Sequence, residues 1–136
     1  MIRVFVDTWY YVAFLDERDH HHGAVTRHAA TLHKTHVTTR WVLAEVANTL
    51  CANRARPGVA AFLSRLEASR LVHVLDGSDE LFDRGLRLYD RRPDKEWSLT
   101  DCISFVVMED EGIREALTND HHFTQAGYVA VFADAS

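Results

Sequence analysis

The sequence predicts an α/β fold, a three-layer α/β/α sandwich around a central parallel sheet of about five strands. Short apolar runs rich in β-branched residues alternate along the chain with longer segments of helical periodicity. The segments between these runs are long enough for the helical crossovers that parallel strands require. The length of 136 residues, with 47% hydrophobic and 26% charged residues, indicates a single globular domain over residues 1–136.

The N-terminal segment contains the first two predicted strands and the first two predicted helices. Ile2–Val6 is a compact apolar run, and Asp7–Leu15 can form a helix because it opens with an Asp-Thr pair. His22–Leu32 carries apolar residues at helical spacing, and His36–Thr38 predicts a weak second strand.

Two helices and a strand are predicted in the middle of the chain. Arg40–Asn53 places its apolar residues on one face. A further helix starts near Pro57, where a first turn tolerates proline, and continues through Leu66. Leu71–Leu75 predicts the third strand, which an Asp-Gly turn closes.

The C-terminal segment predicts two helices and two strands. Leu81–Arg91 has a helical pattern, and Pro93 stops that helix. Thr100–Glu111 is apolar nearly all round, which predicts a buried helix. Ala116–Thr118 and Tyr128–Phe132 complete the set of strands.

The charge balance excludes a protein that binds polyanions over its whole surface. Fifteen basic and twenty acidic residues give a formal net charge of −5, whereas such proteins are usually basic. Any nucleic-acid binding must therefore rest on a local patch or on metal ions. We expect a cytoplasmic protein without a membrane span. No uncharged stretch is long enough to cross a bilayer, Asp7 interrupts a secretory signal, and Cys51 and Cys102 fit free thiols.

Four acidic residues stand where strands end or helices begin. Asp7 and Asp120 follow two predicted strands, and Asp101 lies in the first turn of the buried helix. Glu45 lies one turn into its helix and points about 140° away from the centre of the apolar stripe. In doubly wound sheets, ligands bind beyond the carboxyl ends of the strands. We therefore expect the four carboxylates to gather at one edge of the sheet.

Each of these acids also has a purely structural interpretation. Asp7 and Asp120 can be helix N-caps, and Ser98 with Asp101 resembles a capping box. Glu45 can be a solvated surface acid. However, Ser or Asn would cap a helix as well as Asp does. A carboxylate at every one of these places indicates that negative charge itself is needed.

A cluster of carboxylates predicts a site for a divalent cation. Like charges raise one another's pKa, and a bound cation removes the conflict. Oxygen ligands favour Mg²⁺ or Mn²⁺, which activate water and neutralise the charge of a phosphodiester. Thr8 and Thr118 lie close to the acids in the sequence and could orient them. Ordinary helix-start and strand chemistry explains these two threonines equally well.

The segments that carry the acids resemble those of PIN-domain nucleases, in particular the VapC-type ribonuclease toxins of bacterial and archaeal toxin–antitoxin pairs. The matching segments are Phe5-Val6-Asp7-Thr8, Leu43-Ala44-Glu45-Val46, Ser98-Leu99-Thr100-Asp101-Cys102-Ile103-Ser104-Phe105 and Thr118-Asn119-Asp120-His121-His122-Phe123. The resemblance covers essentially the whole chain. It departs from the family pattern at Trp9, where a small polar residue is more common, and this affects the local shape of the site.

The resemblance implies Mg²⁺- or Mn²⁺-dependent cleavage of RNA on a PIN-like α/β/α sandwich. It also implies a cognate antitoxin, a homodimer, and an acidic metal-binding quartet made of Asp7, Glu45, Asp101 and Asp120. The alternative is a non-catalytic PIN-like module that binds RNA or protein. An aspartyl-phosphate protein is disfavoured, because the segment after the first strand lacks a second Asp and no Lys follows Lys95.

Two further features have competing interpretations. The stripe of Arg84, Arg87 and Arg91 on one helical face, together with Arg54, Arg56 and Arg92, could hold RNA phosphates or an antitoxin. We favour a solvated face whose arginines pair with Asp83 and Asp90.

The nine histidines show no ligand spacing typical of zinc sites. His121 and His122 follow Asp120 and could meet a substrate, but we favour a turn or packing role for them.

Overall fold

The computed structural model describes residues 2–31 and 34–135. The strands are β1 (Arg3–Val6), β2 (Thr35–Thr39), β3 (Val72–Leu75), β4 (Glu115–Leu117) and β5 (Val129–Ala130). The helices are α1 (Thr8–Leu15), α2 (His22–Ala30), α3 (Arg40–Thr49), α4 (Arg56–Ala68), α5 (Asp79–Arg91), α6 (Leu99–Glu111) and α7 (His121–Gln125).

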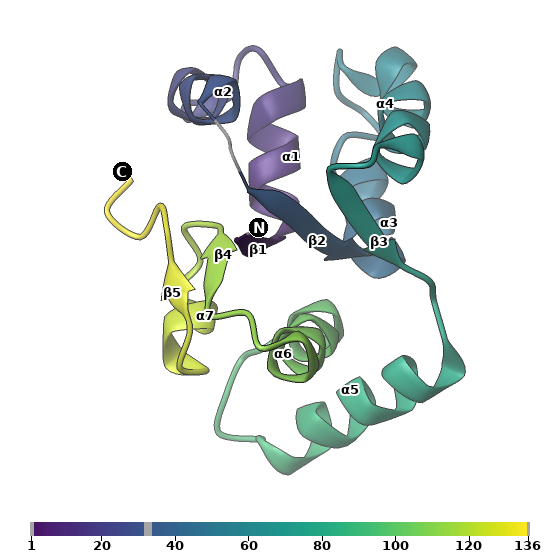
Figure 1. Cartoon of the computed structure of the whole chain (residues 1–136), viewed down its shortest axis with the longest axis vertical. Helices are drawn as coiled ribbons and strands as arrows, with labels where there is room; N and C mark the ends of the chain where they lie inside the picture. The colour runs from purple at the N-terminus through teal and green to yellow at the C-terminus, as the bar shows by residue number, and fades with distance from the viewer. Residues whose placement is uncertain (1, 32–33, 136) are drawn as a thin grey trace.

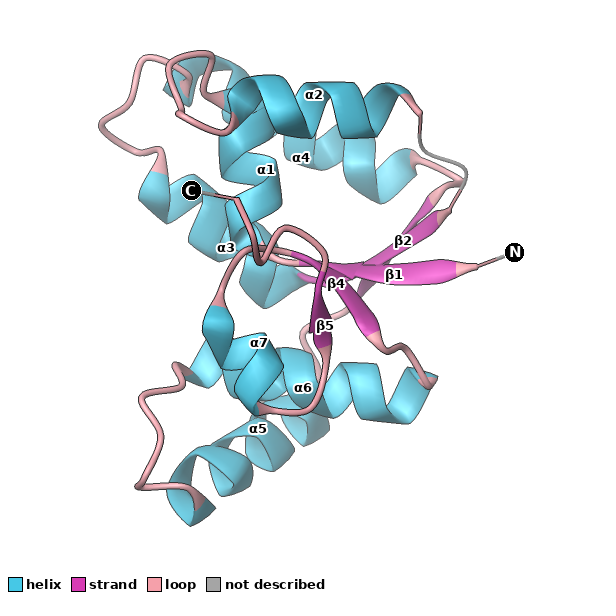
Figure 2. Cartoon of the chain, turned by 90° about the vertical axis from the view of Figure 1, so that its left-hand side faces the viewer, coloured by secondary structure: helices cyan, strands magenta, loops and turns pink. Residues whose placement is uncertain are grey.

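The five strands form one parallel sheet in the order β3-β2-β1-β4-β5. Helices α1 to α4 cover one face of the sheet and α5 to α7 cover the other (Figures 1 and 2). The predicted α/β/α sandwich with a five-stranded parallel sheet is therefore confirmed. In the described part of the chain, no helix combines the length and apolarity needed to cross a membrane.

The central strand β1 is buried on both sides, as a parallel sheet covered by two helical layers requires. Val4, Phe5 and Val6 are fully buried, and they belong to the same hydrophobic core as Phe105 and Met108 of α6. Because β1 sits in the middle of the sheet, its carboxyl end opens between the two helical layers.

Several predicted boundaries differ from the structure. The helix predicted to reach Asn53 ends at Thr49, where the backbone N–H of Leu50 closes the last turn on Val46. The predicted strand Tyr128–Phe132 shortens to Val129–Ala130, because only this pair matches the short neighbour β4. Leu32, the predicted end of α2, lies outside the described residues.

Helix α7 was not predicted. It spans only His121–Gln125, too few residues to show a helical period. The side chain of Asp120 caps it by accepting a hydrogen bond from the backbone N–H of His122, 2.9 Å away. Phe123 anchors the helix, since its ring is fully buried against Phe5 and Phe105.

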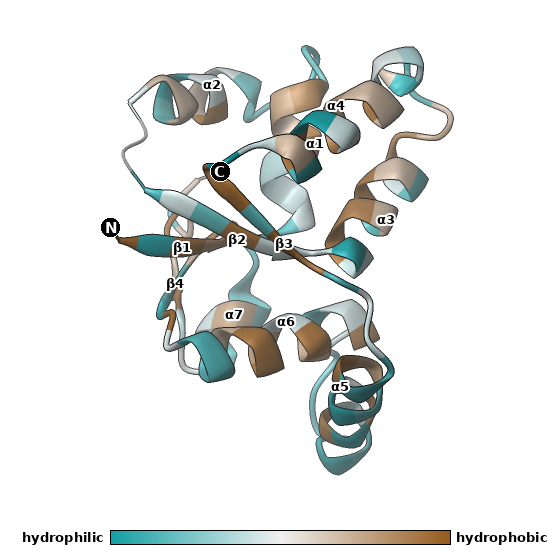
Figure 3. Cartoon of the chain, turned by 45° about the vertical axis from the view of Figure 1, so that its right-hand side comes forward, coloured by the Kyte–Doolittle hydropathy of each residue, from teal (hydrophilic) through white to brown (hydrophobic). Residues whose placement is uncertain are grey.

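Helix α5 lies outside α6 and is the most distant element from the sheet (Figure 2). Hydrophilic residues predominate along its ribbon in the colouring of Figure 3, although the side chains of Phe82, Leu86 and Tyr89 are exposed. Gly85 is buried and lies against Ile103 of α6. Because glycine has no side chain, α5 and α6 can approach each other closely at this position.

We predict that Gly85→Ala destabilises the fold. An added Cβ would lie 2.3 Å from Cγ1 of Ile103 and 3.2 Å from its backbone, and overpacking of this kind costs about 1–3 kcal/mol. The matched control is Gly58→Ala in α4, where an added Cβ meets nothing within 4 Å and should stabilise the helix by about 0.5 kcal/mol. Urea denaturation of the three proteins measures both changes, and equal midpoints would contradict the close packing.

Candidate active site

The strand order reverses between β1 and β4, which is the point where doubly wound sheets place their ligands. A cavity of about 530 Å³ opens there. All four predicted carboxylates line it, and they come from four separate segments of the chain: Asp7, Glu45, Asp101 and Asp120. The fold therefore brings the predicted quartet together at one edge of the sheet.

Asp7 is the most deeply placed of the four acids, with 6% of its surface exposed. Its carboxylate accepts a 2.9 Å hydrogen bond from the hydroxyl of Thr118, which follows the neighbouring strand β4. Asp7 occupies the predicted N-cap position of α1, but among the described residues no side-chain capping hydrogen bond joins it to the helix. Burial raises the pKa of Asp7 to about 7, the bond from Thr118 opposes this rise, and the charge of Asp101 adds to it.

Glu45 projects from the middle of α3 into the same cavity and is half-buried. The hydroxyl of Thr8, the first residue of α1, donates a 2.5 Å hydrogen bond to Oε1 of Glu45. Thr8 and Thr118 thus each orient one carboxylate, which favours the orienting interpretation of these threonines over ordinary helix-start and strand chemistry.

Asp101 and Asp120 are helix caps and site residues at once. Oδ2 of Asp101 accepts from the backbone N–H of Ser98 at 3.1 Å, and the Ser98 hydroxyl accepts from the N–H of Asp101 at 3.0 Å, so the predicted capping box is present. Asp120 caps α7. Burial raises the pKa of Asp101, and the negative charge of Asp120 acts in the same direction.

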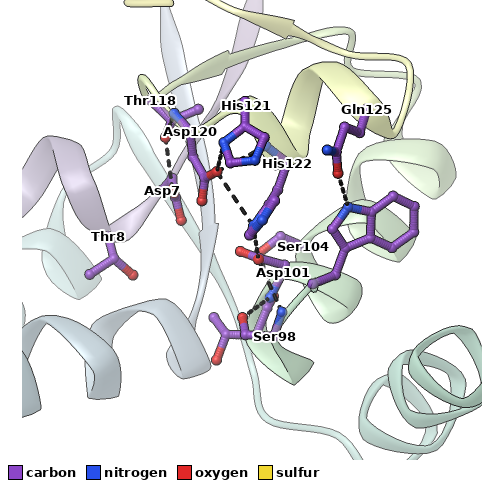
Figure 4. A network of polar contacts seen from close by, with 12 residues as sticks. Asp7, Thr8, Ser98, Asp101, Ser104, Thr118, Asp120, His121, His122 and Gln125 are labelled. Atoms are coloured by element: carbon purple, nitrogen blue, oxygen red, sulfur yellow. Dashed lines mark hydrogen bonds and ion pairs between the residues drawn. The ribbon is translucent and has the colours of Figure 1, made fainter. Parts of the chain in front are cut away.

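His122 joins these two acids, a role that the sequence analysis missed. Its Nδ1 lies 3.2 Å from Oδ2 of Asp101 and 3.4 Å from Oδ1 of Asp120 (Figure 4). The favoured turn or packing role is therefore incomplete, because the imidazole contacts the carboxylates directly. The one available signal was its position two residues after Asp120, and that position becomes informative only when α7 is recognised as a helix.

The distances between potential metal-ligand atoms indicate which ions the cavity can bind. Among the described residues, one group of three or more has potential ligand atoms that all lie within 4.8 Å of one another, namely Asp120, His121 and His122. The four carboxylates surround a wider opening. Mg²⁺ usually keeps several waters and binds through one or two carboxylates, so an opening of this kind fits a hydrated cation.

Glu96, an exposed acid that sequence reasoning did not single out, also lines the cavity.

The family assignment follows from comparison with known proteins. The model of the PIN domain matches residues 4–127, and the chain therefore belongs to the PIN domain family. Within that family it is of the VapC type. It is 31% identical over 131 residues to the 23S rRNA-specific endonuclease VapC20 of Mycobacterium tuberculosis, from both strain CDC 1551 and strain H37Rv, and the match covers 94% of this chain and 97% of the relative.

The structural comparison agrees. The crystal structure of Mycobacterium tuberculosis VapC20, described as a sarcin–ricin loop cleaving toxin, matches with a TM-score of 0.85 and 28% sequence identity. The match covers 94% of this chain and 98% of that chain. The family resemblance found in the sequence motifs is therefore confirmed.

We predict that Asp7→Asn stabilises the metal-free protein at neutral pH. The folded-state pKa of Asp7 is about 7, above its ordinary value of 3.8. The contribution of Asp7 to stability is therefore fully present below about pH 4 and is lost as the pH rises to about 7. At 1.36 kcal/mol per pKa unit, the loss is about 4 kcal/mol, and asparagine does not suffer it.

The measurement is the free energy of unfolding in excess chelator between pH 4.5 and pH 8. The advantage of Asp7→Asn over the wild type should grow with pH across this window. Asp83→Asn, at an exposed position on α5, is the control and should show no such trend. A difference in unfolding free energy between Asp7→Asn and the wild type that does not change with pH would contradict the raised pKa of Asp7.

Proposed function

We propose that this protein is a Mg²⁺- or Mn²⁺-dependent endoribonuclease and the toxin of a type II toxin–antitoxin pair. The proposal rests on one observation above all: four carboxylates from separate segments line one cavity at the reversal of the strand order. Membership of the PIN family and the likeness to an endonuclease that acts on 23S rRNA support it.

The chemistry of the cavity favours a divalent cation. Asp7 is a buried carboxylate close to the negative charge of Asp101 and Glu45, and among the described residues no Lys or Arg lines this cavity to compensate it. Carboxylate oxygens suit hard cations such as Mg²⁺ and Mn²⁺. A divalent cation bound there would neutralise charge on the scissile phosphodiester and lower the pKa of a water molecule.

The protein's own side chains would hold this arrangement in place. We propose that Asp7, Glu45, Asp101 and Asp120 provide the metal site. Thr118 and Thr8 fix the rotamers of Asp7 and Glu45 through their hydrogen bonds. The helix caps fix Asp101 and Asp120, because each carboxylate accepts a hydrogen bond from a backbone N–H. Carboxylates held in this way pay little conformational entropy when a ligand binds.

We predict that cleavage requires a divalent cation and the quartet. A synthetic RNA with the sequence of the sarcin–ricin loop of 23S rRNA, incubated with Mg²⁺ or Mn²⁺, should be cut, and excess chelator should abolish the cut. Asp101→Asn keeps an oxygen for the cap but removes the charge, and should lower the rate at least about 100-fold. Asp83→Asn on the exposed side of α5 should cleave like the wild type.

Metal binding can be measured separately from cleavage. Mn²⁺ at a hundredfold excess over its Kd should stabilise the wild type by about 2.7 kcal/mol, and Asp7→Asn should lose most of this gain. Cleavage that survives in chelator would refute the metal-dependent mechanism. Stabilisation by Mn²⁺ without cleavage of any RNA tested would favour the non-catalytic PIN-like module instead.

We also predict a protein partner and self-association, as the family resemblance implies. A small protein encoded beside this gene should co-purify with the chain and block its cleavage of RNA, because an antitoxin must silence its toxin. Light scattering after size-exclusion chromatography should give twice the monomer mass of 15.5 kDa. A monomer at micromolar concentration would contradict the homodimer.

A further inference from the structure

A second cavity, of about 430 Å³, lies between α5, α6 and α7. Aromatic side chains form part of its wall, namely Trp97, Phe105 and Tyr128. Four arginines line it as well: Arg84, Arg87, Arg91 and Arg92. Glu109 is the one acidic residue among the lining residues of the described chain. The cavity therefore concentrates guanidinium groups at one place in a protein whose formal net charge is −5.

Two of the four arginines are already neutralised. Arg84 forms a bidentate pair with Asp110 at 2.6 and 2.8 Å, and Arg92 forms one with Asp94 at 2.9 and 3.0 Å. The guanidinium of Arg92 also stacks over the ring of Trp97, 5.1 Å from its centroid. These two arginines therefore help to build the cavity.

The other two arginines are available to a ligand. Arg87 and Arg91 are exposed and, within residues 2–31 and 34–135, form no ion pair. Asp83 and Asp90 form none there either, so the interpretation of the stripe as a face paired with these two acids is wrong. Unpaired guanidinium groups one turn apart on a helix match the phosphates of a nucleic-acid strand.

The arginine-lined cavity lies next to the acidic one, although the two share no lining residue. Trp97 lines the first and the next residue, Ser98, lines the second. Helix α7 spans both, since His122 faces the acidic cavity and Gln125 lines the other. The indole N–H of Trp97 donates a 3.0 Å hydrogen bond to Oε1 of Gln125 and joins the loop before α6 to α7 within the arginine-lined cavity (Figure 4).

We propose that the cavity between α5 and α7 binds a nucleotide of the RNA that flanks the cleaved bond. Arg87 and Arg91 would contact its backbone phosphates, and its base would lie against Tyr128, which is partly exposed, whereas Trp97 and Phe105 are buried. Stacking on aromatic groups tolerates any base, so this contact would position the strand and leave the choice of sequence to other contacts. The inference rests on the proposed ribonuclease function. RNA is favoured over an acidic peptide because the unpaired arginines and the aromatic ring lie beside the proposed site of cleavage.

The test compares two double variants with the same change in charge. Arg87→Glu with Arg91→Glu removes the two free guanidinium groups. Arg18→Glu with Arg27→Glu, at two exposed arginines that line neither cavity, is the control. Binding of a fluorescein-labelled 12-nucleotide single-stranded RNA is measured by anisotropy in chelator, which prevents cleavage, at several salt concentrations.

The variant with Arg87→Glu and Arg91→Glu should bind RNA about tenfold or more weakly than the control. The plot of the logarithm of the association constant against the logarithm of the salt concentration should become less steep by about 1.4. Arg87→Gln with Arg91→Gln should give the same fall in slope, and circular dichroism should show that all variants are folded. A series of RNAs with one abasic nucleotide should reveal one position beside the cleaved bond where loss of the base weakens binding.

Other outcomes would overturn the inference. Equal RNA affinity and slope for the α5 variant and the control would show that the cavity does not hold RNA. Unchanged RNA binding with loss of binding to an acidic peptide would assign the surface to a protein partner. If the wild type cleaves RNA in these cases, the proposed ribonuclease function stands without the subsite. If the wild type cleaves no RNA, the proposed function fails whatever the arginine variants do.

Discussion

Burial of a carboxylate between the ends of β1 and β4 is the constraint on which the rest of the site depends. Asp7 follows a strand that is buried on both faces, so its side chain has little access to water. A charge in such a place is costly unless it is paired or hydrogen-bonded. The fold supplies neutral donors, the hydroxyl of Thr118 and the backbone N–H of Thr8, and also places the acids Asp101 and Glu45 close to Asp7. Burial and like charge therefore raise its pKa to about 7. The ionised Asp7 therefore lowers the stability of the folded protein, and binding of a cation or a proton would relieve this destabilisation.

The structural and the functional interpretations of the acids turn out to be compatible. Asp101 and Asp120 use one part of their hydrogen-bonding capacity to cap α6 and α7, and they still line the cavity. A carboxylate has two oxygens and about four acceptor positions, so a cap leaves acceptor positions for a cation. Helix N-termini also carry partial positive charge, which lessens the repulsion among acids placed there. Capping thus gives the negative charges fixed positions at a lower electrostatic cost.

The sequence could predict what depends on local pattern and parallel topology. The strands, the buried helix α6 and the four acids followed from periodicity and from their places at the ends of strands. Helix α7 and the contact of His122 with Asp101 could not be predicted, since a helix of five residues shows no period and the contact joins residues 21 apart. Likewise, the bidentate partner of Arg84 is Asp110 on α6, 26 residues away, and the acid on its own helix that it approaches, at 4.0 Å, is Glu80 rather than Asp83 or Asp90. That pairing depends on the close packing of Gly85 against Ile103, which only the tertiary structure shows.

The charges of this chain are divided between two adjacent cavities. A strand of RNA approaching the acidic cavity alone would meet like charge, and the net charge of −5 offers no general attraction. We propose that Arg87 and Arg91 attract RNA locally, next to the acids, from α5, which lies outside α6. On the proposed arrangement, affinity for the backbone comes from the arginines, whereas the acids remain uncompensated until a cation binds. Because the arginines lie on α5 and the acids lie on other segments, the proposed attraction for RNA and the proposed requirement for metal could each be changed without the other.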